Sequence, residues 1–233
     1  MASTTASLDL YAKVEDLLGV KESAPKLYAH YLLTLQSFAP TSLLDVGCGS
    51  GEFLQQMHQA LAIPHLKGVD LSPIMVARTR ALGIEAEVSD LCSLSGSYGA
   101  ISAVFDMLNY LNPHALTEFL VCVASLLEEG GVFVCDINTL YGFESVAVGA
   151  FIVDDGDRFL TIDSDFEVGE YSAEFTLFEA EGSGFVKSQE TIKQYYHSVE
   201  EIVRLSGLTL LSCDAVNLYG LEESDKHFLV LQK

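Results

Sequence analysis

Three glycines at alternate positions in the segment 47–51 are the residues whose type and spacing most clearly suggest chemistry. They follow a short apolar segment, 43–46, that contains Asp45, and a helix is expected to begin at Glu52. A strand, a glycine turn and a helix N-terminus together let the backbone approach a ligand closely. A dinucleotide site with the pattern Gly-x-Gly-x-x-Gly would need a third glycine where this chain has Glu52, and a glutamate there would repel a pyrophosphate. The turn therefore favours a ligand that carries cationic groups and hydroxyls.

Two further acids follow later strand-like segments. Asp70 lies near the end of the apolar segment 66–71, 23 positions after Gly47. An acid at the end of the second strand of a doubly wound sheet can accept both hydrogen bonds of a ribose diol. The next segment, 84–88, is followed by Asp90, which could instead serve as a turn cap. Because the carboxyl ends of parallel strands line one crevice, these acids are expected to face the same ligand.

Two of these segments resemble motifs of a known family. The stretch Asp45-Val46-Gly47-Cys48-Gly49-Ser50-Gly51 resembles the first motif of the class I S-adenosylmethionine-dependent methyltransferases, and Asp70-Leu71-Ser72-Pro73-Ile74-Met75 resembles the second. The ligand of that family carries a sulfonium, an ammonium and a carboxylate, and no phosphate. The resemblance extends over nearly the whole chain and implies S-adenosylmethionine as cofactor, with S-adenosylhomocysteine as product.

The resemblance also implies where the cofactor would bind. Asp90 would accept a hydrogen bond from the adenine amino group, and the backbone N–H of Leu91 would read the ring nitrogen. Tyr11 matches the position of a tyrosine that often stacks over the ligand, although it fits a helical stripe equally well. Cys48 is interpreted as a small residue that fills the turn rather than as a nucleophile. The implied cofactor-binding residues are Tyr11, Asp45, Gly47, Cys48, Gly49, Gly51, Asp70, Leu71, Met75, Asp90, Leu91, Phe105, Asp106 and Met107.

The segments 106–111 and 135–139 look like those of bacterial small-molecule methyltransferases with a β insertion over the active site. Methyl transfer from a sulfonium is an in-line displacement that depends on close positioning, and a base is needed only when the acceptor must lose a proton. The predicted catalytic residues are Asp106, Asn109, Tyr110 and His197, with Asp136, His114, Tyr141 and Tyr196 as further candidates for a base. No metal site is expected, because the acids lack the spacing of a calcium loop.

An alternation of strand and helix patterns must position these residues, and it runs without a break to Ile137. It predicts a parallel sheet with right-handed crossovers. Gly130-Gly131 is expected to end a helix before a strand at 132–137. With the family's antiparallel last strands, the expected fold class is α/β: a doubly wound, mostly parallel seven-stranded sheet with an antiparallel last strand. Two helices, at about 8–19 and 25–37, are expected before the first strand and would cap the cleft.

The helical period disappears in the middle of the second half. Three β-rich runs, 158–166, 171–180 and 185–196, predict an antiparallel meander inserted after the fifth strand. We therefore expect a core of residues 1–145 and 198–233, in which 1–40 is the helical cap. The insertion, 146–197, is expected to act as a substrate lid or a dimer surface, so that a homodimer is one predicted state.

Composition narrows the partners. The chain of 233 residues has 12 basic and 33 acidic side chains, a formal charge of −21, which argues against nucleic acids and anionic membrane surfaces. No apolar run reaches the ~18 residues of a membrane helix, and a cytoplasmic location is expected. The five cysteines form no Cys-x-x-Cys pair and are expected to be reduced, mostly buried thiols.

These patterns predict a methyltransferase (the EC 2.1.1 class) that acts on a small-molecule acceptor. Two other classes are weighed against it. One is a non-catalytic protein that binds the cofactor on a methyltransferase scaffold, since a fold and a binding motif do not prove turnover. The other is an NAD-dependent oxidoreductase, which Glu52 and the antiparallel last strands disfavour. The acceptor and its accepting atom have no signature in the sequence.

Overall fold

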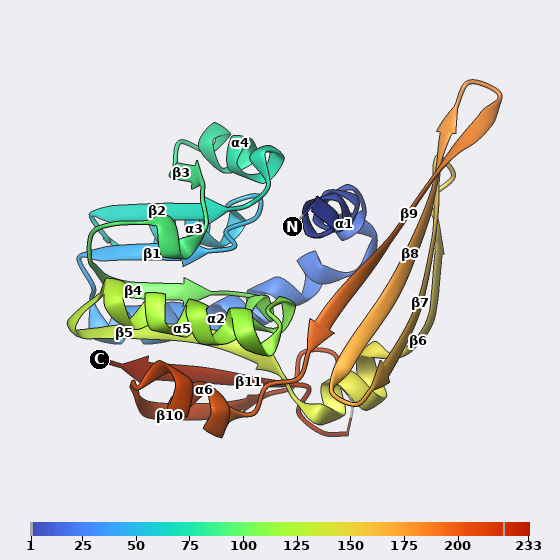
Figure 1. Ribbon diagram of the computed structural model, residues 1–233. Helices are drawn as coiled ribbons and strands as arrows, with labels where there is room; N and C mark the ends of the chain where they lie inside the picture. The colour runs from blue at the N-terminus through green and yellow to red at the C-terminus, as the bar shows by residue number, and fades with distance from the viewer. Residues whose placement is uncertain (1, 221) are drawn as a thin grey trace.

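A seven-stranded sheet forms the centre of the protein, for which a computed structural model describes residues 2–220 and 222–233. The strand order is β10-β11-β5-β4-β1-β2-β3, with β11 antiparallel to both of its neighbours and the pairs from β5 to β3 parallel (Figure 1). The expected fold class is therefore confirmed. The strands are β1 (Ser42–Val46), β2 (His65–Asp70), β3 (Glu85–Val88), β4 (Tyr98–Ala103), β5 (Leu127–Asn138), β10 (Thr209–Val216) and β11 (Lys226–Gln232).

Helices cover both faces of this sheet. On one face α2 (Val20–Phe38) and α3 (Glu52–Ala60) pack through Leu27, Tyr31 and Leu54, all of them fully buried. On the other face α5 (Pro113–Leu126) and α6 (Val199–Ser206) pack through side chains such as Leu120 and Ile202. The fourth helix, α4 (Pro73–Ala81), begins at a proline that follows the cap Ser72 and packs beside β2 and β3. The buried apolar stripes of these helices account for the layered core.

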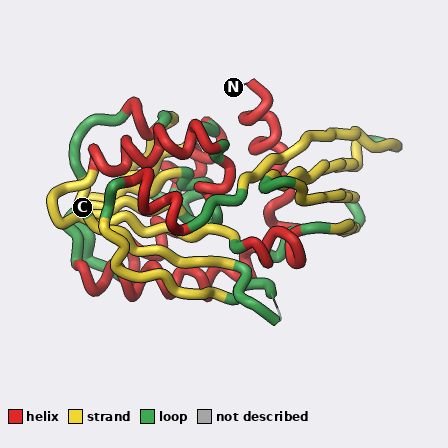
Figure 2. Tube along the Cα trace, turned by 60° about the horizontal axis from the view of Figure 1, so that its bottom comes forward, coloured by secondary structure: helices red, strands yellow, loops and turns green. Residues whose placement is uncertain are grey.

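A second, four-stranded antiparallel sheet extends away from the core as an arm (Figures 1 and 2). Its strands are β6 (Gly149–Asp154), β7 (Arg158–Glu167), β8 (Glu170–Glu181) and β9 (Gly184–Tyr195). The predicted meander of three runs is confirmed, and β6 is an additional strand. Helix α1 (Ala2–Val14) lies against this sheet, where Leu10 and Val14 pack on Leu160 and Leu177. The N-terminal helix thereby joins the second sheet to the core.

Several local predictions were wrong. The helix expected from about residue 8 is α1, which ends at Val14 and is followed by a 3-10 turn, Glu15–Leu17. The next helix begins at Val20, so Pro25 lies inside α2 instead of at its start. Burial of this helix against the sheet offsets the one backbone hydrogen bond that the proline cannot make.

The Gly130-Gly131 pair was also misread as a helix end. Helix α5 already stops at Leu126, and both glycines lie inside β5. The register between β4 and β5 shifts beside them, between Tyr98 and Ala100. Glycines in a strand often accommodate such an irregularity. After β5 a π-helical segment, Gly142–Ala147, leads into the second sheet and was not predicted.

The expectation that all five cysteines are reduced thiols was wrong for one pair. Cys92 and Cys122 form a disulfide across 30 positions of sequence, while Cys48, Cys135 and Cys213 are free. A search for closely spaced cysteines could not find a pair that only the packing of α5 brings together. Within the ranges 2–220 and 222–233, no helix combines the length and apolar content that crossing a membrane requires.

Candidate functional site

A cavity of about 320 Å³ lies at the carboxyl ends of β1, β2 and β4. It brings together every predicted cofactor-binding residue except Gly51 and Asp106. Its walls come from the glycine loop, the ends of β2, β3 and β4, and helices α1 and α2. The predicted residues that line it are Tyr11, Asp45, Gly47, Cys48, Gly49, Asp70, Leu71, Met75, Asp90, Leu91, Phe105 and Met107.

The charge of the cavity wall is one-sided. Five acids line it, Glu15, Asp45, Glu52, Asp70 and Asp90, and no lysine or arginine is among its lining residues. Carboxylates held in a partly enclosed cleft give it a negative potential. Such a wall attracts a ligand that carries ammonium or sulfonium groups and repels a phosphate.

The glycine loop is fixed by bonds to the end of β2. The backbone N–H groups of Gly47 and Cys48 both donate to the carbonyl of Val69, at 2.8 and 3.0 Å. Gly47 has φ +71°, and a Cβ atom there would lie 2.8 Å from Cγ of Met107, another cavity residue. Only glycine combines this left-handed backbone with so close an approach. The loop backbone therefore forms the floor of the cavity.

Gly51 has a different task from the one predicted for it. It lies outside the cavity lining, with φ +84°, and faces Thr79 of α4, whose Cα would be 3.0 Å from an added Cβ. The hydroxyl of Thr79 donates to the carbonyl of Gly49 at 2.9 Å. This glycine thus permits α4 to pack against the loop and does not itself line the cavity.

Asp70 holds the loop from the next strand. Its Oδ2 accepts from the N–H of Gly49 at 2.9 Å, and its Oδ1 accepts from the N–H of Ser72 at 2.8 Å. Burial raises the pKa of this carboxyl, while the backbone donors oppose the rise. The backbone N–H of Leu71 also donates to this carboxyl. A carboxylate has about four acceptor positions, so the side chain keeps capacity for a hydrogen bond from a hydroxyl in the cavity.

Asp45 is the most deeply buried acid of the cavity, with 2% of the residue exposed. Its Oδ1 accepts a hydrogen bond from the hydroxyl of Ser102 at 2.7 Å. Burial raises the pKa of Asp45 to about 8, and that serine bond only partly opposes the effect. A cationic group placed beside this side chain would favour its ionised form.

Asp90 combines both roles that the sequence left open. Its Oδ1 caps the 3-10 turn Leu91–Ser93 by accepting from the N–H of Cys92 at 2.8 Å. The residue also lines the cavity, beside Leu91 and opposite Phe119 of α5. The Cys92–Cys122 disulfide fastens this turn to α5. The helix and the turn that form this end of the cavity are therefore covalently joined.

Two helices close the cavity from above. Leu8 and Tyr11 come from α1, and Tyr28 comes from α2. The ring of Tyr28 meets that of Phe105 edge-on, with centroids 5.7 Å apart. Tyr28 was not predicted as a site residue; its place in the stripe of the second predicted helix was the only available signal.

Of the four predicted catalytic residues, only Tyr110 lines the cavity. Asn109 is fully buried, where its Nδ2 donates to the carbonyl of Tyr195 at 2.7 Å and its Oδ1 accepts from the N–H of Asn138 at 3.0 Å. It links the second sheet to β5 and is not among the residues that line the cavity.

His197 also lies away from the cavity lining. It is 1% exposed, and its Nε2 is 2.8 Å from the carbonyl oxygen of Leu111. Burial lowers the pKa of this imidazole. Among the other candidates for a base, His114 is exposed on the surface and lies 3.6 Å from Glu118, as measured between ring nitrogen and carboxylate. Neither histidine reaches the cavity.

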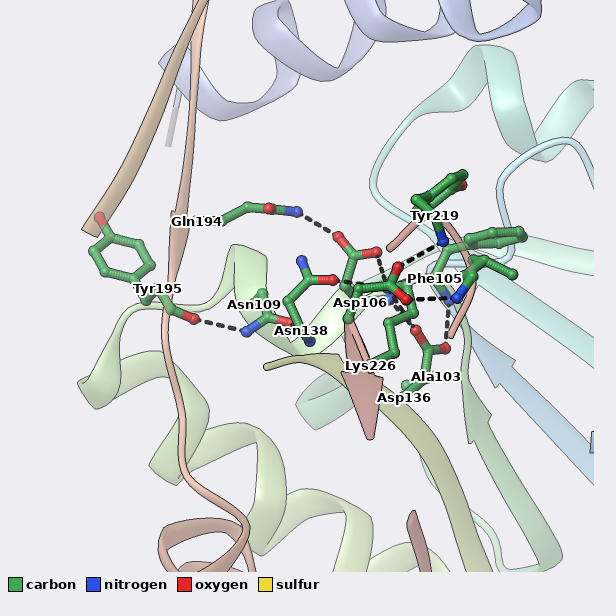
Figure 3. A network of polar contacts seen from close by, with 12 residues as sticks. Ala103, Phe105, Asp106, Asn109, Asp136, Asn138, Gln194, Tyr195, Tyr219 and Lys226 are labelled. Carbon is green, nitrogen blue, oxygen red and sulfur yellow. Dashed lines mark hydrogen bonds and ion pairs between the residues drawn. The ribbon is translucent and has the colours of Figure 1, made fainter. Parts of the chain in front are cut away.

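Asp106 is not among the residues that line the cavity, although its two neighbours are. Its Oδ1 accepts from Nζ of Lys226 at 2.6 Å, and its Oδ2 accepts from Nε2 of Gln194 at 2.5 Å (Figure 3). Both Phe105 and Asp106 have left-handed backbones, with φ +56° and +49°. Sequence reasoning missed Lys226, although a lone lysine that heads the apolar run 226–231 was a visible signal.

Comparisons with known proteins agree with this geometry. Residues 43–131 match a family model described as a methyltransferase domain. Among curated proteins, no sequence matches the chain. The crystal structure of an S-adenosylmethionine-dependent methyltransferase from Clostridium acetobutylicum has a TM-score of 0.79 and 20% sequence identity, covering 96% of this chain and 98% of that chain.

Two further solved structures share the fold. Streptomyces venezuelae DesVI matches with a TM-score of 0.73 and 21% identity, covering 94% of this chain and 97% of that chain. The amino pentose methyltransferase CalS10 from Micromonospora echinaspora matches with a TM-score of 0.68 and 20% identity, covering 88% and 90%. At these identities the likeness shows a common fold. Residues 43–131 are thus similar to a methyltransferase domain, and the chain as a whole shares the fold of S-adenosylmethionine-dependent methyltransferases.

Proposed function

We propose that the protein transfers a methyl group from S-adenosylmethionine to a small-molecule acceptor. The observation that carries the proposal is the cavity wall, with five acids and no lysine or arginine, built on the glycine loop. This wall complements a ligand with cationic groups and disfavours the pyrophosphate of a dinucleotide. It therefore speaks against the oxidoreductase alternative.

Each acid of the wall has a proposed part in holding the cofactor. Asp70, at the end of β2, accepts hydrogen bonds from the ribose hydroxyls. Asp90 accepts a hydrogen bond from the adenine amino group, and the backbone N–H of Leu91 donates to the ring nitrogen. Asp45 and the backbone of the loop 47–51 face the methionine portion. The support is the position of these residues in one cavity and the acceptor positions left on their carboxylates.

Bound S-adenosylmethionine supplies an activated methyl group, which an acceptor lone pair takes by in-line displacement. The part of the protein is to align the two reactants and exclude water, which lowers the entropic cost of the encounter. Phe105, Met107 and Tyr110 line the cavity at the end of β4 and in the following 3-10 turn, Met107–Tyr110. We propose that they border the transferred methyl group. Tyr11 closes the same region from α1.

The acceptor is proposed to be a small molecule with an amine. Three structures that share the fold support a nitrogen acceptor by their descriptions: CalS10 is described as an amino pentose methyltransferase, KedS8 as a sugar N-methyltransferase and MtfA as a glycopeptide N-methyltransferase. An amine is a good nucleophile once neutral, so that little catalysis beyond alignment and proton removal is required.

The second sheet is proposed to be the lid over the acceptor. The proposed domains are a core of residues 1–145 and 198–233 and an insertion of residues 146–197. Its packing on α1, which also lines the cavity, supports this assignment. A homodimer through the arm is the companion proposal, supported by exposed apolar side chains at Phe151, Ile152, Phe185 and Val186. Light scattering tests it. A cytoplasmic location is proposed from the sequence. Thiol trapping in cells tests it, because disulfides are rare in the cytoplasm and Cys92 and Cys122 should then be found as reduced thiols.

Calorimetry with S-adenosylhomocysteine and NADH tests the proposed function. We expect micromolar binding of S-adenosylhomocysteine and none of NADH; binding of NADH alone would overturn the proposal. A panel of small amines and amino sugars with labelled cofactor then tests turnover. Cofactor binding without methylation of any of them would favour the non-catalytic alternative.

A further inference from the structure

A buried cluster of charges lies where strand β9 of the second sheet meets strand β11 of the core (Figure 3). Lys226 is its centre, with 1% of the residue exposed, and it is the only lysine or arginine classed as buried among the side chains that the structure describes. Its Nζ lies 2.6 Å from Oδ1 of Asp106, 3.0 Å from Oδ2 of Asp136 and 2.9 Å from Oδ1 of Asn138. A buried ammonium is tolerated only with such partners.

The pKa of Lys226 reflects this balance. Burial alone would lower it, but the negative charges of Asp106 and Asp136 outweigh burial and raise the pKa above its usual value. The ammonium therefore stays charged across the physiological range. With two carboxylates around one ammonium, the cluster has a formal charge of −1.

Asp136 is fully committed to the protein. Its Oδ1 accepts from the hydroxyl of Tyr31 at 2.7 Å and the N–H of Phe105 at 2.8 Å. Its Oδ2 accepts from the N–H of Asp106 at 2.9 Å and from Lys226. Four donors saturate a carboxylate. Asp136 thus holds the chain in two successive left-handed residues, a conformation that costs of order 1–3 kcal/mol for each residue outside glycine.

Asp106 differs because it keeps capacity for a ligand. Lys226 and Gln194 each donate to one of its oxygens, which leaves two acceptor positions, and 18% of its side chain is exposed. The turn that Asp136 holds aims this carboxylate toward β9 and the second sheet. Of the two acids in the cluster, only Asp106 can therefore bind a further donor.

Tyrosines from four segments are coupled electrostatically to that carboxylate. Burial and the charge of Asp106 together raise the pKa of Tyr11, in α1, well above its usual value. They raise the pKa of Tyr219 to about 12. They raise the pKa of Tyr110 and Tyr171 as well, with neighbouring tyrosines contributing at Tyr110. Tyr11 and Tyr110 also line the cavity, so the cluster adjoins its acceptor end. A carboxylate among aromatic rings is a favourable environment for an organic cation.

We propose that Asp106 binds the acceptor in its ammonium form, which must release a proton to solvent before the neutral amine can attack the methyl group, and that Lys226 and Gln194 are positioning residues that hold the carboxylate of Asp106 toward this site. The inference rests on the proposed function and adds the residues that recognise the acceptor. Gln194 belongs to β9, so the second sheet takes part directly in shaping the site. The site selects for positive charge, since a neutral alcohol of the same shape gains only a hydrogen bond.

The test uses benzylammonium and its neutral counterpart, benzyl alcohol, as probes. Each is titrated by calorimetry into the full-length protein saturated with S-adenosylhomocysteine. We expect the wild type to bind benzylammonium about 10-fold or more tightly than benzyl alcohol, and Asp106→Asn to remove this preference. A wild type without the preference, including one that binds neither probe, overturns the inference.

Variants of the two positioning residues separate orientation from simple charge. Lys226→Met increases the net negative charge of the cluster, so attraction alone would strengthen benzylammonium binding. A positioning role predicts a weaker preference instead, restored in Lys226→Arg. Should Lys226→Met fail to fold, Gln194→Leu leaves the ion pairs intact and is expected to lower the preference about 3- to 10-fold. An unchanged or stronger preference in the folded variants overturns the positioning role.

Lys193→Met is the matched control, because Lys193 precedes Gln194 in β9 but is exposed and paired with Glu170. It should leave the preference unchanged. The affinity for S-adenosylhomocysteine is measured for each variant and should stay within about twofold of the wild type. Cofactor binding without ammonium preference rejects this inference alone, whereas loss of cofactor binding in the wild type rejects the proposed function.

Discussion

The backbone N–H of Gly49 donates to Oδ2 of Asp70 at 2.9 Å, which joins the glycine loop after β1 to the end of β2. Asp70 also accepts from the N–H of Ser72, the cap of α4. A single carboxylate thus ties together the floor of the cavity, the second strand and the following helix. It forms this contact in addition to any hydrogen bonds that it makes with a ligand.

Replacing Asp70 by alanine is expected to weaken S-adenosylhomocysteine binding by ~1–3 kcal/mol, the loss of charge-assisted hydrogen bonds to the ribose. Calorimetry measures the change. Glu87→Ala is the control, because Glu87 is an acid on the neighbouring strand whose pKa is lowered by its bond to Lys67 and which lies outside the cavity. An affinity unchanged by Asp70→Ala would reject the placement of the ribose.

Asp45 should make stability fall as the pH rises. Its pKa is about 8 in the folded protein, well above the ~3.9 of an unfolded chain. The folded state therefore binds more protons between these values, and the stability linked to protonated Asp45 is full below about pH 4 and lost as the pH passes through about 8. At most, this loss in the free energy of unfolding is on the order of 5 kcal/mol, the value that corresponds to the difference between the two pKa values.

Asp45→Asn removes that titration. Urea unfolding at pH 5, 7 and 9 should show a free energy of unfolding that declines less with pH in this variant than in the wild type. Equal slopes for the two proteins would contradict the assigned pKa. Groups distant from Asp45 titrate alike in both proteins, so the difference between the slopes reports Asp45 together with the neighbours coupled to it, Asp70 and Cys48.

Gly51→Ala is expected to destabilise the protein more than Gly83→Ala. Both glycines have left-handed backbones, φ +84° and +81°, so each substitution adds a strain of about 1–2 kcal/mol. An added Cβ at Gly51 would also lie 2.8–3.0 Å from atoms of Thr79, whereas at Gly83 no atom lies within 4 Å. Thermal and urea unfolding measure both. Equal losses would mean that α4 moves freely away from the loop.

Cys122→Ser should lower the free energy of unfolding by about 2–4 kcal/mol in non-reducing buffer, because the disulfide closes a loop of 30 positions. Adding the reductant dithiothreitol should lower the free energy of unfolding of the wild type by the same amount and leave that of the variant unchanged. Cys213→Ser, at an exposed free cysteine, is the control and should have little effect. A stable variant that reductant does not affect, together with an unaffected wild type, would show that the pair is not joined in solution.

The sequence was sufficient for the sheet and for most of the cavity lining. Short apolar runs and glycine turns are local signals, so a strand such as β1 could be placed to within one residue. The positions of Asp45, Asp70 and Asp90 in one cavity then followed from topology, because parallel strands end at the same edge.

Other features had no local signal. Strand β6 is a short edge strand, Gly149–Asp154, and pairs only with β7. His197 was predicted to be catalytic, yet the fold buries it against Leu111. The direction of a side chain in such segments depends on contacts with segments distant in the sequence, and the local sequence does not reveal these contacts.

By itself the sequence determined the class of fold and most of the residues that line the acid-walled cavity. Tertiary structure decided the surroundings of Asp106. A left-handed turn held by Asp136 brings Asp106 to a lysine 120 positions later in the chain. The physical reason is that a charge can be buried only beside groups that neutralise it or bond to it. For Lys226 and Asp106 those groups meet only when β11, β5 and β9 have come together.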